Sequence, residues 1–223
     1  MKTKLIIEAL IKFTIGLILV GLLIFVPAGS LKYINGWIFM ILLFVPIIIV
    51  GIIMFIKNPE LLKSRLESKE KQKNQSVIIK LSGLMFTLGF VLAGLDFRYS
   101  WSAVPPIIIY ISWCTFLMGY ILWAIVLKQN TYLSRTIKVT ENQKVIDTGL
   151  YSVVRHPMYL STIVLFLSMP LVLGSWVSFF VFLIYPILII FRIKDEEKLL
   201  EKELIGYSQY KEKVKCRIIP FIW

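Results

Sequence analysis

The sequence predicts an all-α, polytopic membrane protein with about six membrane crossings. Of its 223 residues, 58% are hydrophobic and 17% are charged, whereas about 45–50% and about 25% are usual in soluble domains. Apolar runs of about twenty residues recur along the chain, and a helix of that length crosses a hydrocarbon core about 30 Å thick. These two observations exclude an ordinary water-soluble globule.

Four apolar segments come first, and we expect each to form one transmembrane helix. They cover residues 5–27, 36–56, 77–95 and 106–127. In the first segment Glu8 and Lys12 are four residues apart and can pair on one helix face. A signal peptide is the competing interpretation of this segment, but its apolar part is longer than the ~7–15 residues of a signal core. We therefore expect a retained helix.

The last apolar block, residues 157–191, contains 35 residues without a charge and is too long for one upright helix. Gly174 and Ser175 interrupt it near the middle, and such a pair disfavours a helix. We therefore predict a helical hairpin with its tip near Gly174, which completes six crossings. A cytoplasmic amphipathic helix should follow, because leucines at 199, 200 and 204 alternate with charged residues.

The basic residues are distributed asymmetrically between the two predicted sides. Of the 25 Lys and Arg residues only Lys32 and Arg98 lie on the side of the short links, which leaves 23 on the other. Cytoplasmic loops carry this excess in membrane proteins, so we expect a multi-pass protein with both termini in the cytoplasm. The net charge of +12 then implies an attraction to anionic membrane lipids and no nucleic-acid partner.

The two cysteines, Cys114 and Cys216, lack metal-ligand spacing, and the chain has one histidine. The sequence therefore predicts neither a metal site nor a disulfide framework. It also gives no sign of an obligate protein partner. Specific polar patterns begin only near residue 136, so we expect N-terminal spans over 1–135 and a functional module over 136–223.

The segment that enters the hairpin carries the first candidate site. Pro157 suits the first position of a helix, with His156 just outside it. The amides and dipole of a helix that begins there favour a carboxylate or phosphate, and Arg155 adds a positive charge. In the alternative interpretation Arg155 binds lipid headgroups, His156 caps the helix, and the nearby tyrosines form an interfacial belt.

A hairpin returns to the plane where it starts, so Arg192, Glu196 and Glu197 should lie near Arg155 and His156. Arg192 and Glu196 share a helix face, and an ordinary i,i+4 surface pair is the alternative interpretation. Together the two segments would offer an anion site, carboxylates and aromatic rings. These groups complement an amino-acid zwitterion joined to adenosine, as in S-adenosylmethionine.

A longer pattern resembles the isoprenylcysteine carboxyl methyltransferase family, a set of membrane enzymes related to phospholipid N-methyltransferases. The resemblance covers roughly residues 136–223. It rests on Gly149, Tyr151, Arg155-His156-Pro157-Met158-Tyr159, Arg192, Glu196-Glu197, Gly206-Tyr207, Tyr210 and the ending 217–223. One departure is Ser161, where the family often has glycine. We expect this small residue to alter a contact without loss of the site.

The resemblance implies an S-adenosylmethionine site at the cytoplasmic end of the hairpin. The residues that it implies for the cofactor are Tyr151, His156, Pro157, Met158, Tyr159 and one of Glu196 and Glu197. We add Arg155 to this cofactor site because its positive charge lies beside the start of the helix. By the same resemblance Arg192 lies near the methyl acceptor. We therefore take Arg192 and Glu196 as the candidate catalytic residues.

The function expected from these residues is methylation of a lipidic or hydrophobic small molecule. A carboxylate acceptor needs no general base and could be held by Arg192, whereas an amine or thiol would need Glu196 or Glu197 as a base. Two other classes are weighed against this one. A small transporter or scaffold is disfavoured because the spans carry almost no internal charge. A nicotinamide-dependent sterol reductase relative is disfavoured by six spans and a short chain.

Overall fold

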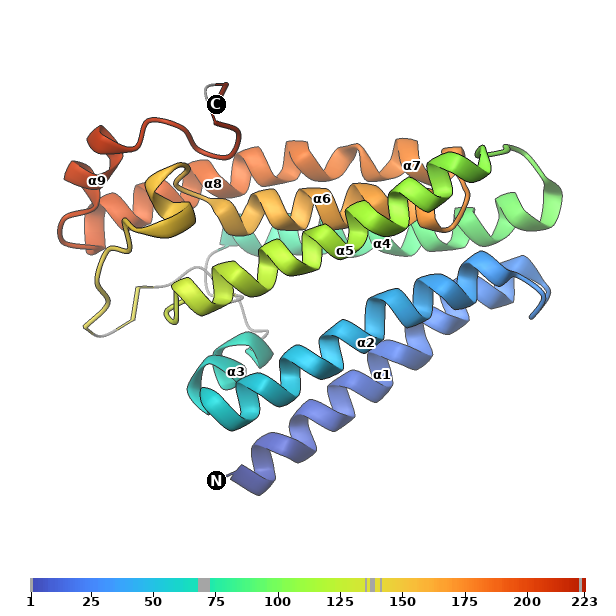
Figure 1. Cartoon of the computed structure of the whole chain (residues 1–223), viewed down its shortest axis with the longest axis horizontal. Helices are drawn as coiled ribbons and strands as arrows, with labels where there is room; N and C mark the ends of the chain where they lie inside the picture. The colour runs from blue at the N-terminus through green and yellow to red at the C-terminus, as the bar shows by residue number, and fades with distance from the viewer. Residues whose placement is uncertain (1, 68–72, 135, 137–138, 141, 221) are drawn as a thin grey trace.

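The computed structural model describes residues 2–67, 73–134, 136, 139–140, 142–220 and 222–223, and these residues contain helices and no strand (Figure 1). The long helices are α1 (Lys2–Ala28), α2 (Ile34–Lys57), α4 (Lys73–Tyr99), α5 (Pro106–Gln129), α6 (Pro157–Val172) and α8 (Ile184–Glu203). Shorter helices are α3 (Pro59–Leu66), α7 (Trp176–Phe182), α9 (Tyr207–Lys213) and the 3₁₀ helix η1 (Gly149–Ser152). The fold is the predicted all-helical membrane protein.

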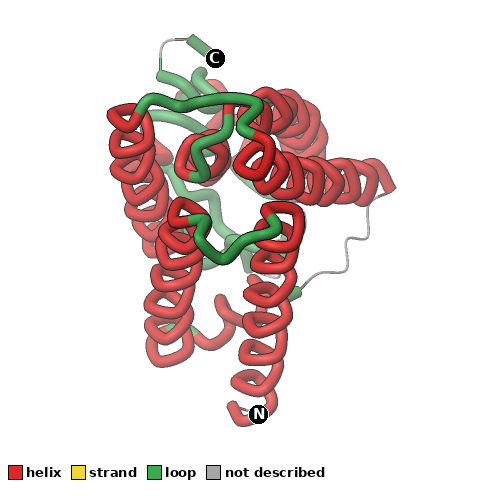
Figure 2. Tube along the Cα trace, turned by 90° about the vertical axis from the view of Figure 1, so that its right-hand side faces the viewer, coloured by secondary structure: helices red, strands yellow, loops and turns green. Residues whose placement is uncertain are grey.

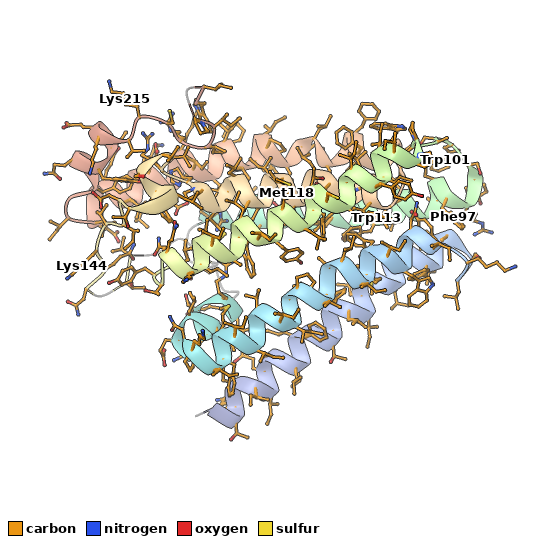
Figure 3. The ribbon with its side chains drawn as sticks, viewed as in Figure 1. Phe97, Trp101, Trp113, Met118, Lys144 and Lys215 are labelled. Atoms are coloured by element: carbon orange, nitrogen blue, oxygen red, sulfur yellow. The ribbon has the colours of Figure 1, made fainter. Side chains whose placement is uncertain are left out.

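The long helices run up and down, so that their connections gather at two ends of the bundle. Figure 2 looks onto the end with the short links after α1, α4 and α6. The opposite end carries α3, α9 and the long loop between α5 and α6 (Figure 1). Figure 3 places Lys144 and Lys215 at this second end, and Phe97 and Trp101 at the first. The basic end and the short-link end are therefore distinct, as the charge pattern requires.

All six predicted apolar segments are helical, but they do not all reach the length of a membrane span. Five stretches of helix are long and apolar enough to cross, and the last of these runs from Trp176 to Glu203 through α7 and α8. Helix α6, the first arm of the predicted hairpin, has 16 residues and rises only about 24 Å at 1.5 Å per residue. Five of the six predicted segments are thus long spans, and the sixth is the shorter apolar helix α6.

The hairpin turns where the sequence indicates. Helix α6 ends at Val172, and α7 begins at Trp176 after Gly174, whose φ of +77° favours glycine. The second arm is interrupted near Leu183, because Pro186 has no N–H to donate to the carbonyl of Phe182. Beyond Pro186 the arm continues without a break to Glu203. The predicted amphipathic helix is therefore the end of α8, and α9 is a separate short helix.

Helices α5 and α6 pack most closely in the bundle. At their crossing Gly119 lies against Leu165, and a Cβ added at Gly119 would come within 2.8 Å of the Leu165 side chain. Small residues permit this approach of two helix backbones in a membrane protein. Helix α6, whose start carries the candidate site, is thereby held against α5 near its middle.

The short-link end is closed by a polar network around Asp96, which is 2% exposed. Asp96 Oδ2 accepts hydrogen bonds from the hydroxyls of Ser102 and Ser175, each 2.5 Å long, and Oδ1 accepts the Ser102 amide at 2.7 Å. Ser102 Oγ in turn accepts the amide of Trp176 at 3.1 Å. The network ties the end of α4 to the tip of the hairpin.

The helix directions predict where tags would lie. Reporter proteins fused after Lys73 and after Trp223 should lie on the same side of the membrane, in the cytoplasm, because the loops at that end hold the basic residues. A reporter inserted at Gly174 should lie on the opposite side. Protease protection or paired fluorescence and phosphatase fusions would measure this, and tags after 73 and 223 on different sides would contradict the helix order.

Candidate functional site

The start of α6 is built as the sequence predicts, but it offers fewer free amides. Pro157 is the first helical residue and His156 precedes it, with no capping bond from the His156 side chain. The amides of Tyr159 and Leu160 both donate to the His156 carbonyl, at 3.1 and 3.3 Å. Since proline has no N–H, only the Met158 amide and the helix dipole remain for an anion. The expected anion cradle is thus narrower than a regular helix start suggests.

The centre of the site is the carboxylate of Glu197, which is 3% exposed. Its Oε1 accepts Arg155 Nε at 2.8 Å and lies 3.2 Å from His156 Nε2, and its Oε2 accepts Arg217 Nε at 3.0 Å. A hydrogen bond to a carboxylate requires the proton on Nε2 of His156. Glu197 therefore joins α8 to the loop before α6 and to the C-terminal segment.

Residues 214–218, which we call the C-terminal strap, run beside the start of α6. The Arg155 amide donates to the Cys216 carbonyl at 2.9 Å, and the His156 amide donates to the Arg217 carbonyl at 2.8 Å. Arg155 Nη1 also donates to the carbonyls of Val214 and Lys215, at 2.6 and 2.9 Å. The guanidinium of Arg155 thus holds the strap and Glu197, and the residue is 6% exposed.

Glu196 takes a different direction from Glu197. Its Oε2 accepts the hydroxyl of Tyr159 at 2.5 Å, and Arg192 Nε donates to the same hydroxyl at 3.0 Å. The Tyr159 hydroxyl therefore lies between Arg192 and Glu196, the two residues that could otherwise form an ordinary i,i+4 surface pair. A tyrosine from α6 in this position shows that the pair belongs to the interface of α6 and α8, and not to a solvated helix surface.

A cavity of about 470 Å³ opens beside these residues, within the range of small-molecule sites. Of the predicted site residues, it is lined by Tyr151, Arg155, His156, Met158, Tyr159, Arg192 and Glu196. Pro157 and Glu197 are not among the lining residues. The structure thus brings the predicted residues together, and it separates the adjacent glutamates into one that faces the cavity and one that braces its wall.

Several lining residues carry no signal in the sequence. Helix α4 contributes Ile78, Ile79, Ser82, Gly83 and Phe86. Arg65 from α3 also lines the cavity, where its Nη1 donates to the Ser134 carbonyl at 3.3 Å and its guanidinium lies 5.8 Å from the centre of the Trp123 ring. The N-terminal half therefore forms one wall of the site. The division into 1–135 and 136–223 stays a prediction.

Three tyrosines near the polar end of the cavity are kept protonated. Burial raises the pKa of Tyr151, Tyr207 and Tyr210, and the charges of Glu197 and Glu196 raise the pKa of Tyr207 further. Tyr210 donates its hydroxyl to the Tyr151 carbonyl at 2.7 Å, and the Tyr151 hydroxyl accepts Asn130 Nδ2 at 3.1 Å. The hydroxyl of Tyr207 has no hydrogen-bond partner among the described residues.

Residues 109–202 match the model of the isoprenylcysteine carboxyl methyltransferase (ICMT) family. This segment is similar to an ICMT-family domain. It includes most of α5, the loop that leads to α6, the whole hairpin and both glutamates. The match supports a membrane methyltransferase.

A curated relative extends the comparison to a second enzyme class. The chain is 30% identical over 91 residues to the Delta(14)-sterol reductase TM7SF2 of Mus musculus, which covers 40% of this chain and 22% of the relative. The matched part thus spans about a fifth of that reductase. A share this small carries no conclusion about the activity of the whole protein.

The two glutamates should respond differently to mutation. Glu197→Ala leaves the buried Arg155 and His156, and the partly buried Arg217, without this acceptor, and breaking a buried pair costs about 3–5 kcal/mol of stability. Glu196→Gln keeps an acceptor for Tyr159 and should change stability by less than about 1 kcal/mol. Thermal unfolding of both variants in the same detergent would measure the difference. Equal losses would contradict the bracing role of Glu197.

Proposed function

We propose that this protein is an S-adenosylmethionine-dependent methyltransferase whose acceptor is a lipidic molecule with an anionic head. The observation that carries the proposal is the stripe of α8 that lines the cavity, Tyr185, Ile189, Arg192 and Glu196. These residues follow at intervals of three or four and share one helix face. The stripe is apolar in the membrane-spanning part and charged at the basic end, which suits an amphiphile that lies along it.

The other walls of the cavity are largely apolar. Helix α4 contributes Ile78, Ile79 and Phe86, and α6 contributes Phe166 in its interior and Tyr159 at its start. An alkyl or prenyl-like chain could pass from the lipid into the space between these walls without contact with water. Its head would then lie beside Arg192.

The side chains at the polar end of the cavity complement the polar and cationic groups of the cofactor. Glu196 offers a carboxylate for ribose hydroxyls or an ammonium group, and the rings of Tyr151, Tyr159 and Tyr207 offer faces to a sulfonium cation. His156 is held in one orientation by Glu197. When bound, S-adenosylmethionine supplies an activated methyl group on its sulfonium.

The residues of the chain would act mainly by orientation and exclusion of water. Methyl transfer is an in-line displacement, so alignment of donor and acceptor accounts for most of the rate. A planar guanidinium at Arg192 can hold a carboxylate, and the bond from its Nε to Tyr159 fixes its plane. A carboxylate acceptor is already ionised and requires no base. An amine or thiol acceptor must release a proton, and Glu196 is the carboxylate among the described lining residues that could accept it.

Binding of the cofactor tests the proposal against its two alternatives. Calorimetry of the detergent-purified protein should give heat with S-adenosylhomocysteine and none with NADPH. Binding of NADPH without S-adenosylhomocysteine would favour a reductase, for which the match to TM7SF2 is the supporting observation. Binding of neither would favour a scaffold or transporter. Labelled methyl transfer from S-adenosylmethionine into membrane extract would then identify the product.

The acceptor class is tested by Arg192→Lys, which keeps the charge and loses the planar fork. The rate of methyl transfer to the acceptor identified in extract should fall by about ten- to a hundredfold. This fall corresponds to the loss of one charge-assisted contact of about 1.5–3 kcal/mol. Cofactor affinity should stay nearly constant. As a matched control, Lys198→Arg on the exposed side of α8 should change neither quantity.

The pH dependence separates a carboxylate acceptor from an amine. A carboxylate is ionised above about pH 5, so the rate should be flat from pH 5 to 9. An amine must lose a proton, so its rate should rise with pH toward its pKa. A steep rise together with a silent Arg192→Lys would overturn the carboxylate assignment.

A further inference from the structure

The hydroxyl of Tyr207 is a buried polar group that the fold itself does not use. Tyr207 is 4% exposed and lines the cavity, and its hydroxyl lacks a hydrogen-bond partner in the part of the chain that the structure describes. Buried polar groups in native proteins are nearly always paired, so an exception requires an explanation. A ligand in the cavity that accepts a hydrogen bond from this hydroxyl would explain it.

The neighbouring tyrosines make the contrast clear. Tyr210 donates to the Tyr151 carbonyl, Tyr159 donates to Glu196, and the Tyr151 hydroxyl accepts from Asn130. Each of these hydroxyls has a structural role in joining two segments. The hydroxyl of Tyr207 alone among these four joins nothing among the described residues.

We propose that the Tyr207 hydroxyl donates a hydrogen bond to a ribose hydroxyl of the bound nucleoside cofactor. This inference rests on the proposed function. It goes beyond that function in assigning a cofactor contact on α9, outside the family match at 109–202.

The charges around Tyr207 select this partner. The hydroxyl lies in the field of Glu197 and Glu196, so a ligand carboxylate at this place would be repelled. A ligand ammonium group would bind the Glu196 carboxylate directly and leave the phenol unpaired. A sugar hydroxyl can accept the proton of Tyr207 and donate its own to Glu196, whose Oε2 alone is used by Tyr159.

The variant Tyr207→Phe tests the assignment, because it removes one oxygen and keeps the buried ring. The affinity for S-adenosylhomocysteine, measured by calorimetry, should fall about three- to tenfold. The melting temperature of the ligand-free protein should stay the same or rise, because no structural bond is lost. The two readouts together distinguish a ligand contact from a packing role.

Two tyrosine variants serve as matched controls. Tyr210→Phe removes a hydroxyl that has a structural partner, so it should lower the melting temperature of the ligand-free protein. Tyr110→Phe, on the exposed face of α5, should change neither melting temperature nor affinity. A loss of ligand-free stability in Tyr207→Phe as large as that in Tyr210→Phe would overturn the inference.

Shortened ligands locate the contact on the cofactor. Methylthioadenosine keeps the nucleoside and lacks the amino acid, so Tyr207→Phe should still weaken its binding three- to tenfold. The 2′,3′-dideoxy analogue of S-adenosylhomocysteine should bind equally to the variant and the natural protein. A penalty that disappears with methylthioadenosine, or persists with the dideoxy analogue, would overturn the ribose assignment.

The failures of the two proposals have different signatures. If the natural protein does not bind S-adenosylhomocysteine, the proposed function is wrong and this inference falls with it. If the natural protein binds and Tyr207→Phe binds equally well, only the assignment of Tyr207 is wrong.

Discussion

Donors from Arg155, His156 and Arg217 converge on the buried carboxylate of Glu197, and the geometry of the cavity depends on this convergence. The three residues come from the loop before α6 and from the strap. Isolated buried charges are costly, so each of these groups needs the others. The same contacts set the proton on Nε2 of His156 and engage the guanidinium of Arg155 with Glu197 and the strap. A local ionic cluster thus determines which side chains are left to face the cavity.

The sequence predicts much of this arrangement, because hydrophobic length and helix-breaking residues act locally. The spans, the first helical residue Pro157 and the turn at Gly174 all follow from such local rules. The roles of Glu196 and Glu197 do not follow from them. Neighbouring residues on a helix point about 100° apart, and which of the two faces the cavity depends on where the strap lies. That position is set by contacts with residues twenty to sixty positions away.

The wall formed by α4 and the position of Arg65 could not be predicted for a different reason. In a membrane span an apolar residue that faces lipid and one that lines a cavity have the same character, so hydrophobicity does not distinguish them. Ile78 and Phe86 therefore look like ordinary span residues. Arg65 lies on a helix of eight residues and belongs to no motif. Only the packing of α3 and α4 against the later helices shows that both contribute to the site.

The two walls of the cavity therefore belong to different parts of the gene. Most of the polar groups lie within residues 109–202, while the apolar wall of α4 and Arg65 come from earlier sequence. Selection can act on these parts separately: divergence in α3 and α4 would change which molecules fit, while the polar end of the cavity stays intact. A lineage that exchanged its first helices would thereby alter the shape of the cavity without losing the polar groups at its end.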